Sequence, residues 1–281
     1  MEKINATGGQ ILAQSLAVHG VKRLSCVAGE SYLAVLDALL EHPEIEVITC
    51  RQEGGAAFMA ESWGKLTGQP GICFVTRGPG ACNAAIGVHT AIQDSTPMIL
   101  FMGQVAREDR GREALQEINV PEVFGGLAKW ATEIDDPARI PEIIYRAFQV
   151  ATSGRPGPVV IGLPEDMLRE QTQTTLTAHY QRTRPAAHSD ALPKLQALLK
   201  ESSKPVAVMG GGTWTDEGCV DFARFAKKAH LPVSASFRRQ DLFDHNHECY
   251  VGELGTGPNP GLIDKIKNES DILEKIRAGV D

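Results

Sequence analysis

The sequence predicts an α/β protein: a doubly wound parallel sheet followed by a second, incomplete α/β domain. Three observations lead to this fold class. Short apolar runs alternate with helical patterns from residue 7 to residue 163. The runs are apolar throughout, which is typical of parallel strands covered by helices on both faces. The length of 281 residues, with 28 Gly and 16 Pro, leaves room for two domains and excludes collagen-like or low-complexity structure.

Capping signals and apolar spacing define the first elements. Thr7 and Gln10 form a capping-box pattern, which predicts a helix from there to Gly20. Ser31 is expected to cap a second helix that stops before Pro43. Two short buried strands are expected at 24–28 and 46–50, and a third helix is expected to open at 53.

The rest of the first domain repeats this alternation. A turn at 77–80 is expected between a strand at 71–76 and a helix of small residues at 81–93. The later elements are expected to be a strand at 97–103, a strand at 130–134, an amphipathic helix at 140–151 and a strand at 158–163. Ligands bind beyond the carboxyl ends of the strands in such sheets, so the segments of interest are 28–30, 52–55, 76–83 and 103–116.

Composition shifts predict the domain boundaries. The first domain is expected to cover 1–170, a polar, Thr-rich linker 171–189, and a partial second domain 190–281. The elements expected in the second domain are a helix at 191–200, a strand at 206–209, a glycine turn at 210–212, a further helix, a strand at 232–236, and a helix at 262–279 with Ser270 as a cap. No third strand is evident, and two short strands do not support a sheet, so this domain is expected to be incomplete.

Charge and composition exclude several classes of partner. The chain carries 28 basic and 35 acidic residues, a net charge of −7, with no Lys/Arg cluster, which argues against a nucleic-acid partner. No signal-peptide pattern opens the sequence, and its longest apolar run is too short to span a membrane. Six scattered cysteines, several within apolar runs, favour a reducing environment. A cytoplasmic protein without a membrane or nucleic-acid partner is therefore expected.

One acidic residue at a strand end stands out as a candidate for chemistry. Glu53 is followed by Gly54 and Gly55, so little side-chain bulk surrounds its carboxylate and a flat ligand could approach it closely. The alternative is an ordinary first-turn acid favoured by the helix dipole, which is the commoner interpretation of an isolated glutamate. The residues alone leave both interpretations open.

A longer pattern around this glutamate resembles a known family. Residues 51–83 read RQEGGAAFMAESWGKLTGQPGICFVTRGPGACN. This string resembles the N-terminal, pyrimidine-binding domain of thiamine diphosphate enzymes, and within them the acetolactate synthase group. The motifs DSTPMILFMGQVA, ALQE and SGRPGPVVIGLPEDM follow in the family's order. The resemblance covers about 5–170 well and extends less well into the family's middle domain, to about 260.

The resemblance implies roles for particular residues. The glutamate matching Glu53 hydrogen-bonds the ring nitrogen of the cofactor's aminopyrimidine and favours the imino tautomer, which removes the proton from thiazolium C2. Gln116 matches a glutamine near the reacting atoms. Without the resemblance, it would be interpreted as a residue on a helix surface. The remaining cofactor-binding residues implied by the match are Ala28, Gly29, Thr76, Gly80 and Asn83.

Three positions depart from the family pattern. Arg77 stands where acetolactate synthases usually carry Ser, Glu30 replaces Gly, and Glu165 replaces a frequent Lys. These departures leave related carboligases and 2-oxo acid decarboxylases open. Arg77 could bind a substrate carboxylate as a bidentate donor, or it could be a surface charge, and the sequence favours neither.

A motif of the family is missing. The C-terminal domain of the family holds Mg²⁺ and the diphosphate through a Gly-Asp-Gly motif, which this sequence lacks. The chain is thus expected to supply half of a thiamine diphosphate site and no metal ligands of its own. Mg²⁺ would bind only through a missing or partner domain, in a homodimer or hetero-oligomer. The turn at Gly210–Gly212 is a candidate for FAD, but the shortness of the second domain argues against it.

The function implied by the resemblance is that of an acetolactate synthase-like transferase or lyase. It would be a thiamine diphosphate-dependent carboligase or decarboxylase of small 2-oxo acids, which needs a partner domain for turnover. The alternative is a non-catalytic binding or regulatory module that keeps the pyrimidine-domain fold.

Overall fold

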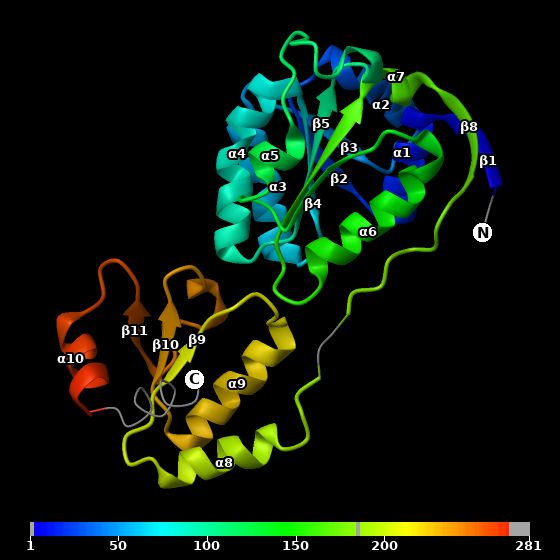
Figure 1. Ribbon diagram of the computed structural model, residues 1–281. Helices are drawn as coiled ribbons and strands as arrows, with labels where there is room; N and C mark the ends of the chain where they lie inside the picture. Colours follow the sequence, from blue (N-terminus) through cyan, green and yellow to red (C-terminus); the bar gives the residue numbers. More distant parts are fainter. Residues whose placement is uncertain (1–2, 184–185, 270–281) are drawn as a thin grey trace. The chain divides into compact units, whose positions relative to one another are not determined.

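The computed structural model describes residues 3–183 and 186–269. The protein chain divides into two compact units, residues 1–184 and residues 185–281, and each unit has its own sheet (Figure 1). Over the described ranges, none of the helices combines the length and apolar character that crossing a bilayer requires.

The first unit is built on a six-stranded parallel sheet with the strand order β3-β2-β4-β5-β7-β6. The strands are β2 (Arg23–Cys26), β3 (Glu46–Thr49), β4 (Gly71–Thr76), β5 (Met98–Gln104), β6 (Trp130–Glu133) and β7 (Pro158–Pro164). The two strands β5 and β7 are buried at every residue, which explains their continuous apolar sequence. The predicted doubly wound parallel sheet is confirmed.

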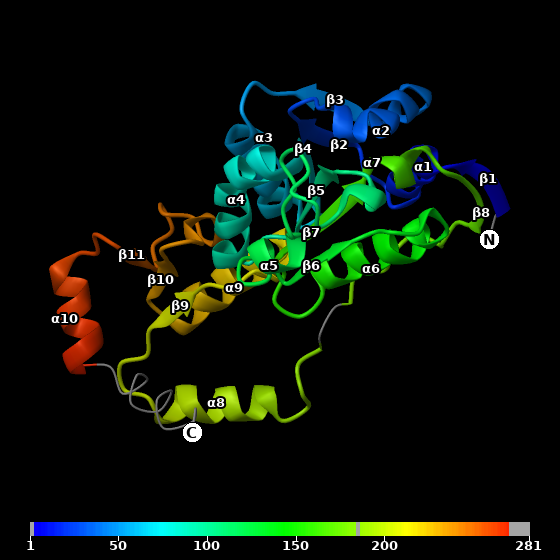
Figure 2. The same ribbon diagram turned by 45° about the horizontal axis from the view of Figure 1, so that its top comes forward.

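Helices cover both faces of this sheet (Figures 1 and 2). One face carries α1 (Gly8–Val18), α2 (Leu33–Ala38), α6 (Ile140–Thr152) and α7 (Glu165–Arg169), and the other carries α3 (Glu53–Thr67), α4 (Arg77–Asp94) and α5 (Val120–Phe124). Successive side chains of β4 alternate between the two: Ile72 and Phe74 join one hydrophobic core, while Cys73 and Val75 join the other.

Local capping signals were predicted with mixed success. The capping box at Thr7 is present, and Gly20 adopts a left-handed φ of 79° just beyond the end of α1. The predicted cap at Ser31 was wrong, because α2 follows Tyr32 with no side-chain cap bond. The predicted turn at 77–80 was also wrong, since α4 already begins at Arg77 and Pro79 fits its first turn.

The prediction of a linker over 171–189 was wrong for the first residues of this range. Residues 171–175 form β8 (Gln171–Thr175), which pairs antiparallel with β1 (Lys3–Thr7). Further along, Leu176 and Tyr180 are buried, and Tyr180 belongs to the core under α1 and α6. These polar residues gave no strand signal because the partner strand lies at the other end of the domain sequence.

The second unit has a three-stranded parallel sheet in the order β11-β10-β9. Its elements are α8 (Ala191–Glu201), β9 (Ala207–Met209), α9 (Asp216–Ala229), β10 (Val233–Ser236), β11 (Tyr250–Leu254) and α10 (Pro260–Glu269). The expectation of only two strands was wrong, since β11 is a third strand. Its YVGEL sequence gave no clear signal because it is short and interrupted by glycine. The predicted helix at 262–279 is observed as far as Glu269, and its predicted cap, Ser270, lies outside the described residues.

Candidate functional site

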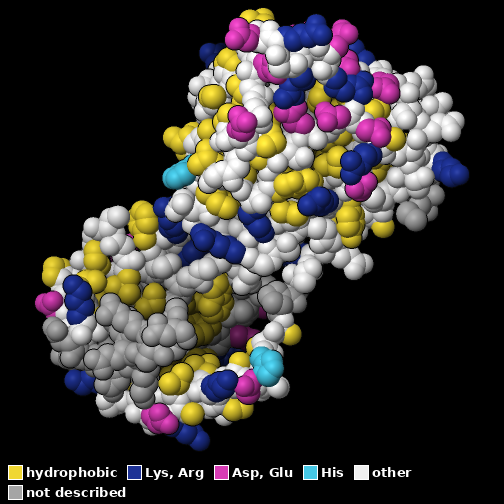
Figure 3. Space-filling model, viewed as in Figure 1, with side chains coloured by type: hydrophobic (Ala, Val, Ile, Leu, Met, Phe, Trp, Pro, Cys, Tyr) yellow, Lys and Arg dark blue, Asp and Glu magenta, His cyan; other side chains and the backbone are white. Residues whose placement is uncertain are grey.

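The predicted site segments converge at the carboxyl edge of the large sheet. Glu53 is the first residue of α3, which follows β3, and Thr76 is the last residue of β4. The segment 28–30 follows β2, the strand between these two. Acidic and basic side chains gather along this edge of the unit, at the top of Figure 3. Because parallel strands end together, residues far apart in sequence become neighbours here.

Glu53 and Asn83 form the centre of this group. The Asn83 side-chain amide donates a hydrogen bond to the Glu53 carboxylate, with Nδ2 3.0 Å from Oε2. Gly80 lies beside the other carboxylate oxygen: a Cβ on Gly80 would stand 3.6 Å from Oε1 of Glu53. One carboxylate oxygen is thus oriented by an amide, and the other lies beside Gly80, where the side chains of Val75 and Thr76 also border the position of a Cβ.

A second contact joins Gly29 to Thr76. A Cβ on Gly29 would lie 2.5 Å from the Cβ of Thr76, so only glycine fits at this position. The hydroxyl of Ser31 lies 2.6 Å from that of Thr76. Ser31 was predicted as a helix cap, and its buried hydroxyl instead ties the segment after β2 to the end of β4. Ala28 is exposed at the start of the same segment.

Gln116 approaches the same edge through its backbone. It lies in a loop and not on a helix, with an exposed side chain and a left-handed φ of 63°. Its carbonyl oxygen accepts a 2.9 Å hydrogen bond from the N–H of Gly78 in the first turn of α4. A Cβ on Gly78 would stand 2.8 Å from that oxygen, so the glycine allows the loop to dock.

Arg77, Glu30 and Glu165, the three departures from the family pattern, form one ion triad. The Arg77 guanidinium donates to Oε1 of Glu30 at 2.7 Å and to Oε2 of Glu165 at 3.1 Å. The Arg77 side chain is only 10% exposed, so the surface-charge interpretation was wrong. Its backbone has a φ of 39°, in a region that costs a non-glycine residue about 1 kcal/mol.

The thiols and phenol behind this edge serve packing. Burial raises the pKa of the Cys26 and Cys73 thiols, so both stay protonated. Burial also raises the pKa of Tyr32, whose hydroxyl donates to the carbonyl of Val27 at 2.5 Å. Neither Cys26 nor Cys73 therefore supplies a thiolate at this edge.

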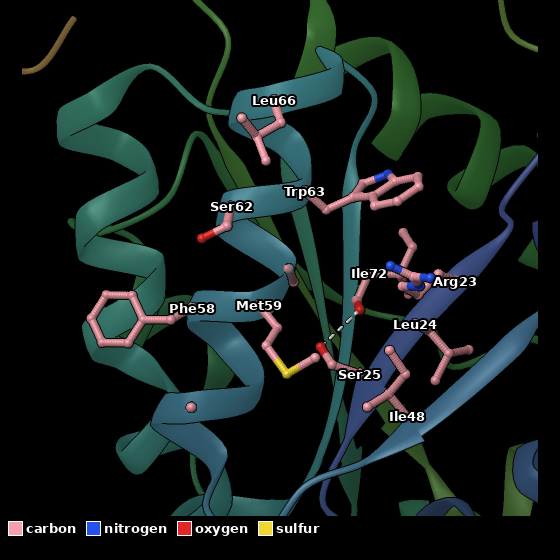
Figure 4. A pocket seen from close by; sticks show the side chains of 12 residues that line it. Arg23, Leu24, Ser25, Ile48, Phe58, Met59, Ser62, Trp63, Leu66 and Ile72 are labelled. Carbon is pink, nitrogen blue, oxygen red and sulfur yellow. Dashed lines mark hydrogen bonds between the residues drawn. The ribbon is translucent and has the colours of Figure 1, made fainter. Parts of the chain in front are cut away.

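An apolar pocket of the first unit lies elsewhere. It encloses about 360 Å³ between α3 and the strands β2 and β3. In Figure 4, Met59 points toward Ser25 and Ile48, while Trp63 points toward Arg23. Its lining includes Gly55 but none of Glu53, Gly29, Thr76, Gly80 and Asn83.

Two features of the chain bear on metals and on FAD. Within 3–183 and 186–269, no group of three or more His, Cys, Asp or Glu side chains is arranged to hold a metal ion. The Gly210–Gly212 turn follows β9, and two of its three carbonyls accept hydrogen bonds: that of Gly210 from the Trp214 indole and that of Gly211 from Arg239.

The fold and the site define a class of protein. A doubly wound α/β unit here presents a carboxylate, in the first turn of a helix, at the carboxyl edge of its sheet, which is where such sheets bind ligands. Two family models match the chain: the N-terminal TPP-binding domain of thiamine pyrophosphate enzymes over residues 6–123, and the central domain of the same enzymes over residues 192–273. The chain therefore belongs to the thiamine pyrophosphate enzyme family.

Within this family the chain is similar to acetolactate synthases. It is 34% identical to the acetolactate synthase large subunit of Lactococcus lactis, over 89% of this chain and 44% of the relative. It is 30% identical to the mitochondrial acetolactate synthase of Schizosaccharomyces pombe, over 96% of this chain and 42% of the relative. It is also 34% identical to the chloroplastic acetolactate synthase of Arabidopsis thaliana, over 88% of this chain and 38% of the relative. The chain thus spans less than half the length of these relatives.

Proposed function

We propose that this chain supplies the pyrimidine-binding half of the active site of an acetolactate synthase-like enzyme, a thiamine diphosphate-dependent carboligase or decarboxylase of 2-oxo acids. The observation that carries the proposal is the Glu53 carboxylate, held at 3.0 Å by Asn83 at a sheet edge lined by glycines. The similarity to acetolactate synthases supports the choice of reaction class.

The residues at this edge fit an aminopyrimidine. Gly80 adds no side chain of its own next to Glu53 Oε1, so the side chains of Val75 and Thr76 border this position, and a ring would approach the carboxyl group from its other side. Gly29, Thr76 and Asn83 would line the ring, with Ala28 at the entrance. The bound cofactor supplies the electron sink for cleavage and formation of the carbon–carbon bond. Glu53 holds or transfers a proton at the ring nitrogen, and Asn83 fixes the carboxyl orientation that this transfer requires.

The diphosphate end of the cofactor needs polypeptide outside the printed sequence. The 281 residues contain no Gly-Asp-Gly motif, and a divalent cation on a diphosphate needs hard oxygen ligands in fixed positions. We therefore place Mg²⁺ and the diphosphate on another segment or another chain that packs against this edge, in a homodimer or hetero-oligomer. Gln116, on an exposed loop at the same edge, would face the substrate from this chain.

Thiamine is a suitable probe for the pyrimidine half, because it carries the ring without the diphosphate. We expect thiamine to shift the amide NMR signals of Thr76, Gly80 and Asn83 in the isotope-labelled chain. Glu53→Ala should weaken this binding about tenfold, because a charge-assisted hydrogen bond is lost. Glu122→Ala is the matched control, since Glu122 is also a first-turn acid, on α5.

The outcome separates the two functions that the sequence left open. Saturable binding that depends on Glu53 and not on Glu122 supports the enzyme half-site. Absence of binding at millimolar thiamine, or equal binding by Glu53→Ala, would count against the proposal and favour a non-catalytic module that keeps only the fold.

A further inference from the structure

Arg77 combines features that are costly for an arginine. Its side chain is 10% exposed, its Nε lies buried with no hydrogen-bond partner among the described atoms, and its φ of 39° is left-handed. A residue that keeps a buried charge, an unpaired donor and a strained backbone together is held there by its surroundings, and such residues cluster at functional sites.

The ion triad connects three strand ends. Arg77 follows β4, Glu30 lies beyond the end of β2, and Glu165 opens α7 directly after β7. Glu165 is 24% exposed and fixed, whereas Glu30 is 67% exposed and reaches in from the surface. The guanidinium therefore draws the segment after β2 toward the start of α4, with Glu165 as its anchor.

The segments joined by the triad are those that line the site proposed above. Gly29 and Ser31, on either side of Glu30, both contact Thr76, which precedes Arg77. The ion pair and the hydroxyl pair thus tie the same two segments side by side. Without the ion pair, the Ser31–Thr76 hydroxyl contact of 2.6 Å and the Val27 N–H to Phe74 carbonyl bond of 3.2 Å would still join the two segments, but no charged contact would.

The backbone of Arg77 extends the same arrangement to the Gln116 loop. Its left-handed conformation precedes Gly78, whose N–H donates to the Gln116 carbonyl at 2.9 Å. Gln116 is itself left-handed, with a φ of 63°. A change of backbone at residue 77 would therefore move the donor that holds this loop.

Electrostatics argue against a substrate carboxylate at Arg77. Two carboxylates already bind its guanidinium, so the triad carries a net negative charge. A further cation, Arg169, stands 4.0 Å from Glu165 and is itself exposed. A third carboxylate would meet repulsion from Glu30 and Glu165 before it gained a free donor.

We propose that Arg77 is a positioning residue: through Glu30 and Glu165 it holds the 29–31 segment, the first turn of α4 and the Gln116 loop in the arrangement that binds the aminopyrimidine. This role rests on the proposed function, since it assigns the triad to that same site. It requires no contact between Arg77 and the cofactor.

The test uses the full chain and two readouts, thiamine affinity and the hydrogen-exchange rate of the Gly78 amide. Arg77→Gln should weaken thiamine binding about tenfold and speed Gly78 exchange about tenfold, because both ion pairs are lost. Glu30→Gln breaks only the ion pair between Arg77 and the exposed Glu30. It should therefore weaken thiamine binding and speed Gly78 exchange by smaller factors. Arg107→Gln is the matched control: Arg107 also binds two carboxylates, Asp166 and Glu170, and its hydrogen bonds run to these and to the Asp135 carbonyl rather than to residues 29–31, the first turn of α4 or Gln116.

A triple variant separates positioning from simple charge balance. In Glu30→Gln/Arg77→Gln/Glu165→Gln no carboxylate is left unpaired, so stability should recover toward that of the wild type. We expect its thiamine affinity to stay low. Recovery of affinity in the triple variant would overturn the positioning role, as would wild-type affinity and exchange in Arg77→Gln.

The Gly78 exchange rate keeps the two proposals distinguishable. If the wild type failed to bind thiamine, the proposed function would fail. Faster Gly78 exchange in Arg77→Gln, but not in Arg107→Gln, would then still support the structural role of the triad, and unchanged exchange would refute it. If Arg77→Gln does not fold, the exposed Glu30→Gln variant provides both readouts.

Discussion

The carboxylate of Glu53 and the amide of Asn83 lie 3.0 Å apart, Oε2 to Nδ2, although 30 residues separate them in sequence. They come from the first turn of α3 and the second turn of α4, two neighbouring helices that follow β3 and β4. An amide donor at this distance leaves one carboxylate oxygen oriented and the other available beside Gly80. This pair defines the candidate site more closely than either residue alone.

Removal of the amide should weaken the site without unfolding the protein. Asn83 is exposed, so Asn83→Ala should change the free energy of unfolding by less than about 1 kcal/mol. Thiamine affinity should fall about fivefold, because the Glu53 carboxylate loses its fixed orientation. Titration by NMR measures this, with His89→Ala, an exposed residue of the same helix, as control. Equal losses in the two variants would contradict the role of Asn83.

Substitution of Glu53 by Gln tests whether the site needs the carboxyl proton of this side chain, because the shape of the side chain is kept. Glutamine keeps the size of the side chain but has no carboxyl proton to exchange with a ring nitrogen. In the assembled enzyme with thiamine diphosphate bound, Glu53→Gln should slow hydrogen–deuterium exchange at thiazolium C2 by about 10²-fold or more. An exchange rate equal to that of the wild type would show that Glu53 does not take part.

Two glycines of α4 should respond differently to alanine. At Gly80 the nearest heavy atom to an added Cβ would be 3.3 Å away, so Gly80→Ala should fold while it fills the space beside Glu53 and weakens thiamine binding. At Gly87 the Cβ would lie 2.5 Å from the Cβ of Ala57, so Gly87→Ala should destabilise the α3–α4 contact by about 1–3 kcal/mol. Urea denaturation and thiamine titration of both variants would separate these effects, and the opposite pattern would contradict this account.

His19 should make the stability of the first unit depend on pH. Burial, helped by the neighbouring His179, lowers the pKa of His19 from 6.5 to about 4. Between these values the unfolded chain binds a proton that the folded chain does not. The free energy of unfolding should therefore fall as the pH drops from 6.5 toward 4, by up to about 3 kcal/mol, and depend less on this residue below pH 4.

The His19 contribution can be isolated by comparison of variants. His19→Gln should flatten the pH dependence of the free energy of unfolding over this range, whereas His89→Gln, on the exposed side of α4, should keep it. Urea denaturation at several pH values gives the slopes. A slope in His19→Gln as steep as in the wild type would show that other groups cause the acid sensitivity.

Tyr180 tests the part of the chain that sequence patterns assigned to a linker. Its ring is 7% exposed and packs 5.0 Å from the ring of Phe148, and its backbone N–H donates to Nδ1 of His19. Tyr180→Ala should destabilise the first unit by about 2–4 kcal/mol. Native-state hydrogen exchange of the β4 and β5 amides measures this. Gln181→Ala, one exposed residue further on, should have no effect, and a silent Tyr180→Ala would mean that the segment is dispensable.

Much of the fold could be predicted because its signals are local. The capping box at Thr7 and the continuous apolar runs of β4, β5 and β7 lie within a few residues of the structure they specify. The position of Glu53 at the head of a helix after a strand was also visible. Once such strands pair in parallel, their carboxyl ends form one edge, so the general location of the site followed.

Other features depend on partners that sequence spacing does not reveal. The strand β1 pairs with β8 across more than 160 residues, and neither strand is apolar enough to be predicted from its own sequence. The strand β11 is recognisable only beside β10. The Ser31 hydroxyl had a plausible local use as a cap, but Thr76, which is 45 residues away, offers it a buried partner.

What the sequence determined by itself was the alternation of strands and helices from α1 to β7, the family motifs, and the chemical types available at the sheet edge. Only the tertiary structure decided which of those groups meet. Arg77 finds its carboxylates 47 and 88 residues away, and the three departures from the family pattern become one ion triad. The physical reason is that periodicity reports how a segment is buried, whereas charge pairing depends on distances fixed by the packing of the whole sheet.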